Sequence, residues 1–275
     1  MYQAYWGLGR SPFRGNLDPT TFHQGPTQEE ALARLHFLVD ERRTLGLLLG
    51  ESGSGKSLLL EVFRRELGTI GKQRALISLI GLDRHQFFWL LAGQLGIEVS
   101  PRDSLFTLTR ATTDHIIASR YQQLTTILLL DDADEAAAEV LNETIRIAQL
   151  TQTSEARVTI VLSARPRYLH RLGTRILELA ELRVDLESWE QEDTSLFVKA
   201  SLAMSGRTTP VFTESALRRL QELTGGVPRR IKQIADLALL AGAGSNLGLI
   251  ESETIESVFH ELGVVAAPSM AGNRR

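Results

Sequence analysis

A glycine-rich segment carries the residues best suited to chemistry. Gly50-Glu51-Ser52-Gly53-Ser54-Gly55-Lys56-Ser57 fits the pattern G-x-x-x-x-G-K-[ST] at every position. Glycines let such a loop turn its backbone N–H groups toward phosphate oxygens, and a helix that begins there adds the positive end of its dipole. The spacing predicts that Lys56 contacts nucleotide phosphates and that Ser57 ligates Mg²⁺. A glycine-rich turn with an incidental lysine is the alternative.

A pair of aspartates follows a second apolar run. Residues 127–130 are Ile-Leu-Leu-Leu, and Asp131 and Asp132 come next. At the carboxyl end of a parallel strand, Asp131 would lie where open α/β sheets bind ligands, which predicts that it holds Mg²⁺ directly or through water. Asp132 is expected to polarise an attacking water. An acidic turn that caps the next helix, formed by these two residues with Asp134, is the alternative.

The elements that must position these motifs alternate along much of the chain. Short apolar runs typical of buried strands alternate with stretches typical of helices, which predicts a parallel sheet with helices on both faces. After residue 189 the pattern changes to helices alone. The expected strands span residues 45–49, 74–80, 126–130, 158–163 and 182–186, and the expected later helices span 192–204, 214–223, 228–241 and 253–262.

The predicted fold class is therefore α/β: a three-layer sandwich of the P-loop NTPase type with a parallel five-stranded sheet, followed by a smaller all-α lid domain. Among the helix starts, we expect Thr27 with Glu30 to form a capping box, and residues 100–103 to begin another helix. The expected division is an irregular N-terminal segment at 1–26, the α/β domain at 27–188, the lid domain at 189–263 and a flexible tail at 264–275.

Composition excludes several classes of function. The 275 residues carry a formal net charge of -3, so the chain lacks the general basic field that binds nucleic acid through phosphates alone. Cysteine is absent, which excludes disulfides, thiolate zinc sites and cysteine nucleophiles. The six histidines lack metal-ligand spacing. No apolar run reaches the ~20 residues of a membrane span, so we expect a cytoplasmic protein without direct membrane insertion.

The N-terminal segment and a later motif add a family resemblance. They comprise Tyr5, Gly7-Leu8, Pro12-Phe13, Asp18-Pro19 and Phe22, and Gly225-Gly226-Val227-Pro228-Arg229-Arg230-Ile231. With the phosphate loop and the acidic pair, they resemble AAA+ ATPases of the ExeA/GspA type (general secretion pathway protein A), associated with type II secretion, and more distantly TniB-like transposition ATPases. The resemblance implies ATP and Mg²⁺ as ligands, ATP hydrolysis that drives conformational change in a partner or assembly, and a homo-oligomer.

The resemblance also implies roles for single residues. Arg229 would be the sensor 2 arginine, which reaches the nucleotide from the lid. Sensor 1 is expected at the end of the fourth strand, at Arg165, with Ser163 as the alternative. With Lys56 and Asp132, Arg165 and Arg229 complete the expected catalytic group. Either Arg175 or Arg183 would project into a neighbouring subunit's site, unless both are solvated surface charges. Pro12 and Phe13 would pack in the core or near the adenine.

Departures from the family pattern leave alternatives open. Asp132 stands where the family has glutamate, and a misplacement of ~1 Å can cost ~100-fold in rate. The chain could therefore be a slow ATP hydrolase, or a nucleotide-gated switch or adaptor with little hydrolysis. A DNA-bound regulator of the transposition or replication type is a further alternative, with a basic lid face at Arg218-Arg219, Arg229-Arg230 and Lys232. The expected protein partner belongs to a secretion or transposition system.

Overall fold

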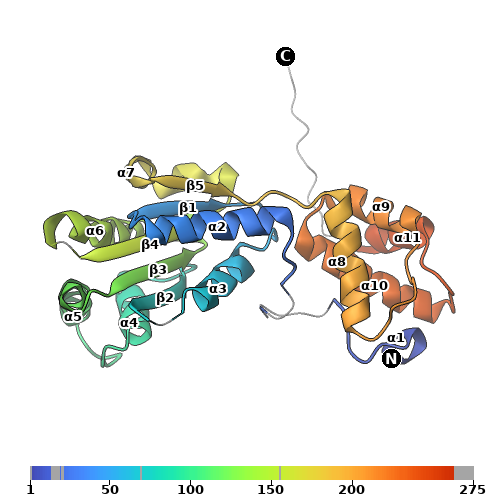
Figure 1. The fold of residues 1–275 in the computed structure, drawn as a ribbon, viewed down its shortest axis with the longest axis horizontal. Coiled ribbons are helices and arrows are strands. Elements are labelled where there is room, and N and C mark those ends of the chain that lie inside the picture. Colours follow the sequence, from blue (N-terminus) through green and yellow to red (C-terminus); the bar gives the residue numbers. More distant parts are fainter. Residues whose placement is uncertain (1, 14–18, 20–21, 69, 155, 263–275) are drawn as a thin grey trace, which may run out of the picture. The chain divides into compact units, whose positions relative to one another are not determined.

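The structure is a computed structural model that describes residues 2–13, 19, 22–68, 70–154 and 156–262, with the chain dividing into two compact units (Figure 1). One unit, residues 17–187, is called the α/β unit below. The other joins residues 1–16 to residues 188–275 and is called the helical unit. Asp18 of the N-terminal motif and the expected tail at 264–275 lie outside the described residues.

The α/β unit is built on a parallel five-stranded sheet, as the sequence predicts. Its strands are paired in the order β2-β3-β4-β1-β5. Apolar runs form these strands because both faces of the sheet are covered, so that nearly every side chain in β1, β3 and β4 is buried. The strands are β1 (Leu45–Leu49), β2 (Lys72–Ser78), β3 (Thr125–Asp131), β4 (Arg157–Ala164) and β5 (Leu182–Asp185).

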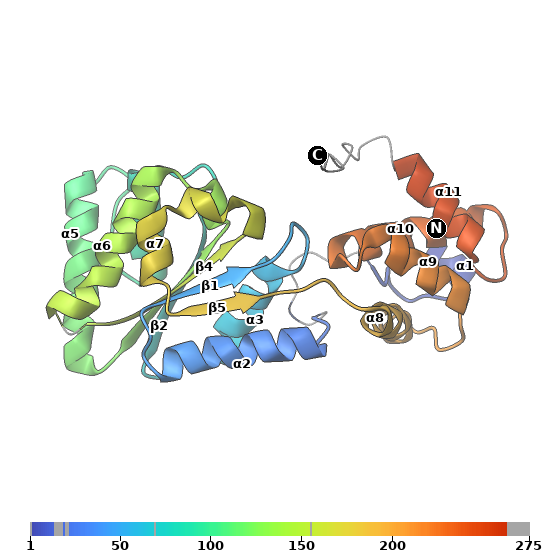
Figure 2. The same ribbon diagram turned by 90° about the horizontal axis from the view of Figure 1, so that it is seen from above.

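Helices cover the two faces of the sheet and complete three layers (Figure 2). Alternate residues of a strand point to opposite faces: Leu48 and Val161 pack in the cluster under α2 and α3, whereas Leu47 and Ile160 pack in the cluster under the other helices. The first face carries α2 (Pro26–Asp40) and α3 (Lys56–Glu66). The second carries α4 (Arg84–Gln94), α5 (Leu105–Ala118), α6 (Ala138–Ser154) and α7 (Thr174–Leu179).

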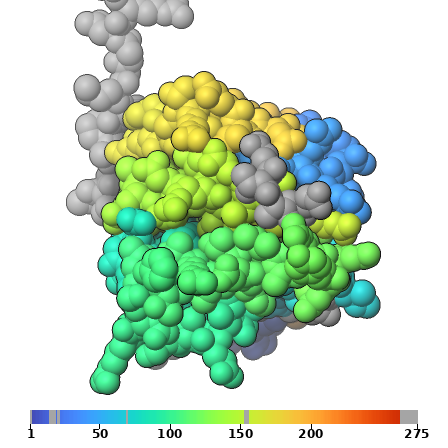
Figure 3. All heavy atoms as spheres, turned by 90° about the vertical axis from the view of Figure 1, so that its left-hand side faces the viewer, coloured from blue at the N-terminus to red at the C-terminus, as the bar shows by residue number. Residues whose placement is uncertain are grey.

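At one end of the α/β unit, α5 packs beside α6. Figure 3 shows this end, where the green surface of α5 adjoins the yellow-green surface that follows it in the chain. The connections between strands also contain short 3₁₀ helices: η2 (Ser119–Gln122), η3 (Ala133–Glu135) and η4 (Pro166–Leu172). Helix η3 follows the end of β3, and helix η4 follows the end of β4.

Two predicted helix starts are wrong. Helix α2 begins one residue before Thr27, because Gly25-Pro26 supplies an extended residue and then a proline whose fixed φ suits the first helical position. Helix α5 begins at Leu105, since the Ser104 hydroxyl accepts a hydrogen bond from the backbone N–H of Thr107, three residues later. The expected start instead forms a turn in which the backbone of Ser100 donates to the Asp103 carboxylate at 2.7 Å.

The helical unit contains the N-terminus as well as the expected lid helices. Residues 2–13 are not a separate irregular segment: Tyr2–Trp6 forms the short helix α1, and the Trp6 indole donates to the Leu239 carbonyl at 2.8 Å. Phe13 stacks 6.1 Å from Phe197, so it packs in the core of this unit. The later helices are α8 (Gln191–Met204), α9 (Glu214–Thr224), α10 (Pro228–Gly244) and α11 (Ser252–Leu262).

None of the helices in the described part of the chain combines the length and the apolar character that crossing a membrane requires.

Candidate nucleotide-binding site

The strand order brings the predicted site residues to one edge of the sheet. All strands are parallel, so their carboxyl ends lie at the same edge. The glycine-rich loop follows β1, and Asp131 ends β3. Strand β4 lies between them, which places Ser163 near the end of β4 between the loop and the acidic pair. An edge of this kind is where open α/β sheets bind ligands.

Lys56 is a buried cation at the start of α3. It is 7% exposed, and its Nζ donates to the carbonyl oxygens of Gly50 at 2.7 Å and Glu51 at 3.1 Å. Burial lowers the pKa of the Lys56 ammonium, although the negative charges of Asp131 and Asp132 oppose this shift. In the described part of the chain no carboxylate pairs with Lys56. A buried ammonium held only by carbonyls favours an anionic ligand.

The loop around Lys56 has further features that fit a polyphosphate. The Ser54 hydroxyl is buried and has no hydrogen-bond partner. Buried polar atoms are nearly always hydrogen-bonded, so this hydroxyl is suited to a ligand. Gly55 has a φ of 102°, which a residue with a side chain rarely adopts, and this conformation turns the loop into α3. A concave loop, a helix N-terminus and a buried cation together form a phosphate site.

Asp131 is held in position by a serine on the neighbouring strand. The Ser163 hydroxyl donates to the Asp131 carboxylate, and the backbone N–H of Asp132 donates to the same hydroxyl at 3.0 Å. The described residues contain no group of three or more acidic, histidine or cysteine side chains that could hold a metal alone. Mg²⁺ usually keeps several waters and binds one or two carboxylates together with phosphates, so Asp131 with Ser57 of the phosphate loop is suited to this ion.

Asp132 has an unusual backbone and a partly buried carboxylate. Its φ of 55° lies in the left-handed region, where aspartate is one of the few residues found in place of glycine. Burial raises the pKa of the Asp132 carboxyl, and the negative charge of Asp131 raises it further, while Lys56 lowers it. The Ser78 hydroxyl, at the end of β2, lies 3.4 Å from Asp132 Oδ2. Such a carboxylate is suited to orienting a water.

The expected sensor 1 residue, Arg165, forms salt bridges with the acidic residues of η3. Its Nε donates to the buried Asp134 at 2.5 Å, and its Nη2 contacts Glu135. Ser163, the alternative, is the residue of β4 that contacts Asp131. The geometry therefore favours Ser163. Ser78 was not among the predicted site residues, although its hydroxyl lies in a predicted apolar strand, which was a usable signal.

Comparison with known proteins finds a family that is similar to part of the chain. The family profile described as AAA domain matches residues 39–172, a range that includes the glycine-rich loop, the acidic pair and Ser163. This part of the chain is therefore similar to an AAA domain. The matched range covers most of the α/β unit and contains residues 50–57 and Asp131, whereas Arg229 lies outside it.

A curated relative and solved structures extend the similarity beyond the AAA domain. The general secretion pathway protein A of Aeromonas hydrophila is 26% identical over 245 residues, which are 88% of this chain but only 45% of that protein. This match confirms the predicted resemblance. The chain therefore spans less than half the length of that relative.

The solved structures share the fold of the AAA domain and of the helices after it. The Cdc6 protein of Pyrobaculum aerophilum superposes with a TM-score of 0.72 at 19% identity, covering 89% of this chain and 70% of that one. The Orc1 protein of Aeropyrum pernix, solved in complex with DNA, gives 0.67 at 15% identity, with 88% and 67% covered. The RuvB branch migration motor of Thermotoga maritima gives 0.59 at 13% identity, with 86% and 70% covered.

The two candidate trans arginines of the α/β unit differ in their surroundings. Arg183, on edge strand β5, binds both carboxylate oxygens of Asp185 at 2.8 Å. Arg175 is exposed on α7, and in the described part of the chain it has no ion pair. An arginine already neutralised in its own subunit is a poorer partner for a neighbour's phosphate, so the geometry favours Arg175.

Arg229 lies in the helical unit, exposed in the first turn of α10. The turn that precedes it depends on glycine: a β-carbon at Gly226 would lie 2.1 Å from the Trp189 carbonyl oxygen. Gly226 also accepts a hydrogen bond from the backbone of Trp189 at 2.9 Å. The glycine-glycine-x-proline-arginine motif therefore anchors the start of α10 against the segment that leads into α8, and fixes where Arg229 emerges.

The predicted basic lid face is only partly available to a ligand. Arg219 is paired with Glu222 and Glu256 at 2.8 and 2.7 Å. Lys232 is half-buried, with its Nζ 5.5 Å from the centre of the Phe197 ring. Two of the five basic groups of this face are thus occupied by contacts within the helical unit, which weakens the case for it as a DNA surface.

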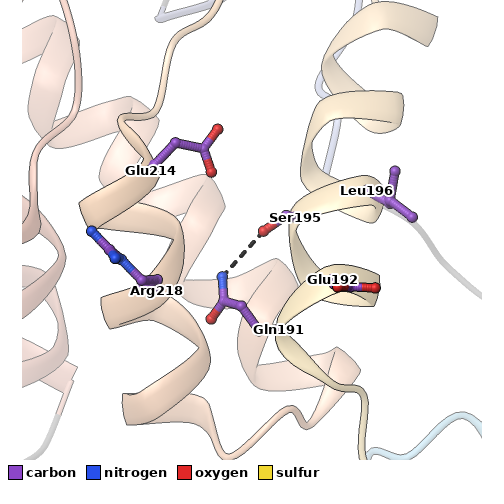
Figure 4. A pocket seen from close by; sticks show the side chains of 6 residues that line it. All are labelled: Gln191, Glu192, Ser195, Leu196, Glu214 and Arg218. Atoms are coloured by element: carbon purple, nitrogen blue, oxygen red, sulfur yellow. Dashed lines mark hydrogen bonds between the residues drawn. The ribbon is translucent and has the colours of Figure 1, made fainter.

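A hollow of about 490 Å³ lies between α8 and α9 of the helical unit (Figure 4). Charges of both signs line it, and Gln191 donates to the Ser195 hydroxyl at 3.1 Å. It has neither a glycine-rich loop nor a buried unpaired cation, so it lacks the features of a phosphate site. Its lining residues are Gln191, Glu192, Ser195, Leu196, Glu214 and Arg218.

Proposed function

We propose that this chain is an ATP hydrolase that binds Mg-ATP, converts ATP and water to ADP and phosphate, and uses the reaction to change the conformation of a partner or assembly. The observation that carries the proposal is the buried, unpaired Lys56 in the loop of a region similar to an AAA domain, at the same sheet edge as Asp131. The fold and the family are both consistent with it.

Each residue of the proposed site has a distinct role. Lys56 and the backbone N–H groups of residues 50–57 bind the phosphates, and Ser57 and Asp131 hold Mg²⁺. When bound, Mg²⁺ supplies positive charge that neutralises charge developing on the phosphate oxygens. Asp132 orients the attacking water, and Ser163 holds Asp131 in position as the sensor 1 residue.

Arginines from elsewhere complete the proposed site. Arg175 of a neighbouring subunit contacts the terminal phosphate in a homo-oligomer, and Arg229 acts as sensor 2. An arginine supplied in trans is worth ~10³–10⁵-fold in turnover, so an isolated monomer should be almost inactive. The exposure of Arg175 and the absence of an ion pair on it among the described residues support this assignment.

A nucleotide-gated switch with little hydrolysis is the second candidate. It is favoured by Asp132, whose side chain is one methylene shorter than the family's glutamate. Turnover of the Asp132→Glu variant separates the two functions. A large gain over the parent supports the switch, whereas no gain supports an ordinary ATPase.

The name of the relative from Aeromonas hydrophila suggests where the ATPase acts. We propose a protein partner in a secretion system or, by the more distant resemblance, in a transposition system, reached from the cytoplasmic side. Because the chain spans less than half of that relative, the assignment rests on the ATPase portion alone.

The test measures binding and turnover separately. Saturating Mg-ATP at 100 times Kd should stabilise the protein by about 2.7 kcal/mol, visible as a rise in melting temperature. Phosphate release should follow at high protein concentration, with light scattering to detect an oligomer. Loss of both effects in Lys56→Met supports the proposal. No nucleotide-dependent rise in the parent protein would overturn it.

A further inference from the structure

Three arginines surround a single tyrosine after β4. The guanidinium carbons of Arg165, Arg167 and Arg171 lie 4.4, 4.7 and 4.5 Å from the centre of the Tyr168 ring. Cation–π contacts attract each guanidinium to the ring, but they also bring like charges together. Such a cluster needs negative charge nearby to be stable.

Among the described residues, only one of the three cations has carboxylate partners: Arg165 contacts Asp134 and Glu135. Arg171 donates to the backbone carbonyl oxygen of Asp134 at 3.4 Å, and this oxygen carries no full charge. Arg167 is exposed, and no carboxylate pairs with it in the described part of the chain. Two neighbouring exposed guanidiniums therefore have no carboxylate partner among the residues that the structure describes.

The local sequence keeps this surface basic and polar. From residue 165 to residue 177 there are four arginines and no acidic residue. Leu172 and Ile176 are buried and Leu169 packs against the core cluster of the sheet, whereas Leu177 is 39% exposed. A segment that binds a membrane surface combines basic residues with a continuous apolar face, and one exposed leucine does not form such a face.

We propose that the surface formed by Arg167, Arg171 and Tyr168 binds the phosphodiester backbone of a nucleic acid. Guanidiniums match phosphate oxygens with two parallel hydrogen bonds, and the tyrosine ring restricts where both cations can lie. At an exposed site a single phosphate gains little, because surface ion pairs contribute ~0–1 kcal/mol. A polyanion gains from each contact through release of its counterions, so it is the ligand that suits this open surface.

This surface is distinct from the nucleotide site but is linked to it. Arg165 and Arg171 both contact Asp134, which lies two residues after Asp132. Helix η3, which follows β3, and helix η4, which follows β4, therefore contact each other. The site differs from the lid face that the sequence suggested, and it lies wholly within the α/β unit.

The test is the fluorescence anisotropy of a labelled DNA duplex of arbitrary sequence, titrated with the full chain without nucleotide. In the parent protein, log K should fall linearly with log salt between about 50 and 200 mM. The Arg167→Glu/Arg171→Glu variant should bind at least about tenfold more weakly at 50 mM salt, with a salt slope reduced by about two, one for each lost phosphate contact. Arg167→Lys/Arg171→Lys should retain most of the slope.

A matched control keeps the net charge change the same. Arg102→Glu/Arg110→Glu reverses two exposed arginines elsewhere on the α/β unit and should bind like the parent. The melting temperature of each variant, with and without nucleotide, shows whether the variant is folded. Lys56→Met should still bind DNA. Failure of this proposal can therefore be distinguished from failure of the ATPase proposal. Each of the following results would overturn the proposal: no DNA binding by the parent protein at 50 mM salt, or an equal loss of DNA affinity in both double variants. Competition by poly-glutamate as strong as that by DNA, or a preference for phosphatidylserine vesicles over DNA, would also overturn it.

Discussion

Ser163 on β4 donates a hydrogen bond to the carboxylate of Asp131 on β3. The same hydroxyl accepts from the backbone of the next residue, so that one serine fixes both the side chain that would hold Mg²⁺ and the turn that follows it. The pairing is possible because β4 lies between the strand of the phosphate loop and the strand of the acidic pair.

Replacing Ser163 with alanine should weaken metal-dependent activity more than it weakens folding. Groups that orient a metal ligand typically contribute 10–100-fold in metal affinity or activity. We therefore expect the Mg²⁺ concentration for half-maximal ATPase to rise by about that factor. Thr159→Val is the matched control, since it removes another hydroxyl of β4. This hydroxyl donates to the backbone carbonyl oxygen of Arg43 at 2.9 Å. A similar Mg²⁺ response in both variants would contradict a positioning role.

Lys56→Met should separate nucleotide binding from stability. In the absence of ligand, Lys56 is a buried cation without a carboxylate partner, and an apolar side chain of similar length avoids the cost of desolvating that charge. We expect an unchanged or higher melting temperature without nucleotide, and no further rise on adding Mg-ATP. A variant that melts much earlier than the parent would show that Lys56 is mainly structural.

The pKa of Asp132 should set the pH below which turnover falls. Its raised pKa means that it binds a proton at higher pH than a free aspartate, and only the deprotonated form can orient water as a base. Turnover should therefore fall as the pH drops through this raised pKa. Ser78 donates to the charged form, so Ser78→Ala should move the acid limb to still higher pH. A rate profile with its acid limb at the ordinary aspartate value of about 3.9 would contradict this assignment.

The same pKa shift has a consequence for stability. Between the unfolded and the folded pKa of Asp132, the folded state holds more protons than the unfolded state, so the free energy of unfolding decreases as the pH rises through that window. At neutral pH the ionised Asp132 is thus a cost, and Asp132→Asn should raise the melting temperature measured without Mg²⁺. We expect this rise to be small, because Asp132 is only partly buried and solvent screens its charge.

Mixing two inactive variants should identify the trans arginine. Arg175→Ala should lose on the order of 10³-fold in turnover while still binding nucleotide. Lys56→Met lacks binding but keeps Arg175, so mixed oligomers of the two should regain part of the activity. Arg183→Ala should stay near the parent, because Arg183 is already paired with Asp185. No recovery on mixing, with oligomers present by light scattering, would exclude Arg175.

The strands and the phosphate loop could be predicted because their signals are local. An apolar run, a glycine-rich loop and a pair of aspartates each occupy a few consecutive residues. The choice between Ser163 and Arg165 could not be made in that way, since it depends on the order of strands in the sheet. The family resemblance suggested Arg165, but Asp134 and Glu135 neutralise it, while the smaller hydroxyl of Ser163 reaches Asp131.

Local sequence patterns also could not predict where the N-terminal residues pack. Glycines and prolines predicted that the first residues form no long helix, and α1 has only five residues. Nothing in a single sequence, however, pairs Trp6 with Leu239 or Phe13 with Phe197, which are separated by most of the chain. Such contacts depend on complementary shapes that appear only after folding. Residues that resembled a family signature thus have a packing role in the helical unit.

Trp6 should therefore be essential to the helical unit. It is 2% exposed, and Gly242 leaves room for its ring, since a β-carbon there would lie 2.9 Å from it. Trp6→Ala should cost about 3–5 kcal/mol, as large aromatic truncations in cores do. Near-ultraviolet circular dichroism should show loss of tertiary structure at a lower temperature. Exposed Tyr5→Ala is the control. It should cost far less, because the ring is 42% exposed and loses only a hydrogen bond to Leu247 at 2.8 Å and an edge contact with the Trp6 ring. Equal melting of the two variants would contradict the role given to the N-terminal segment.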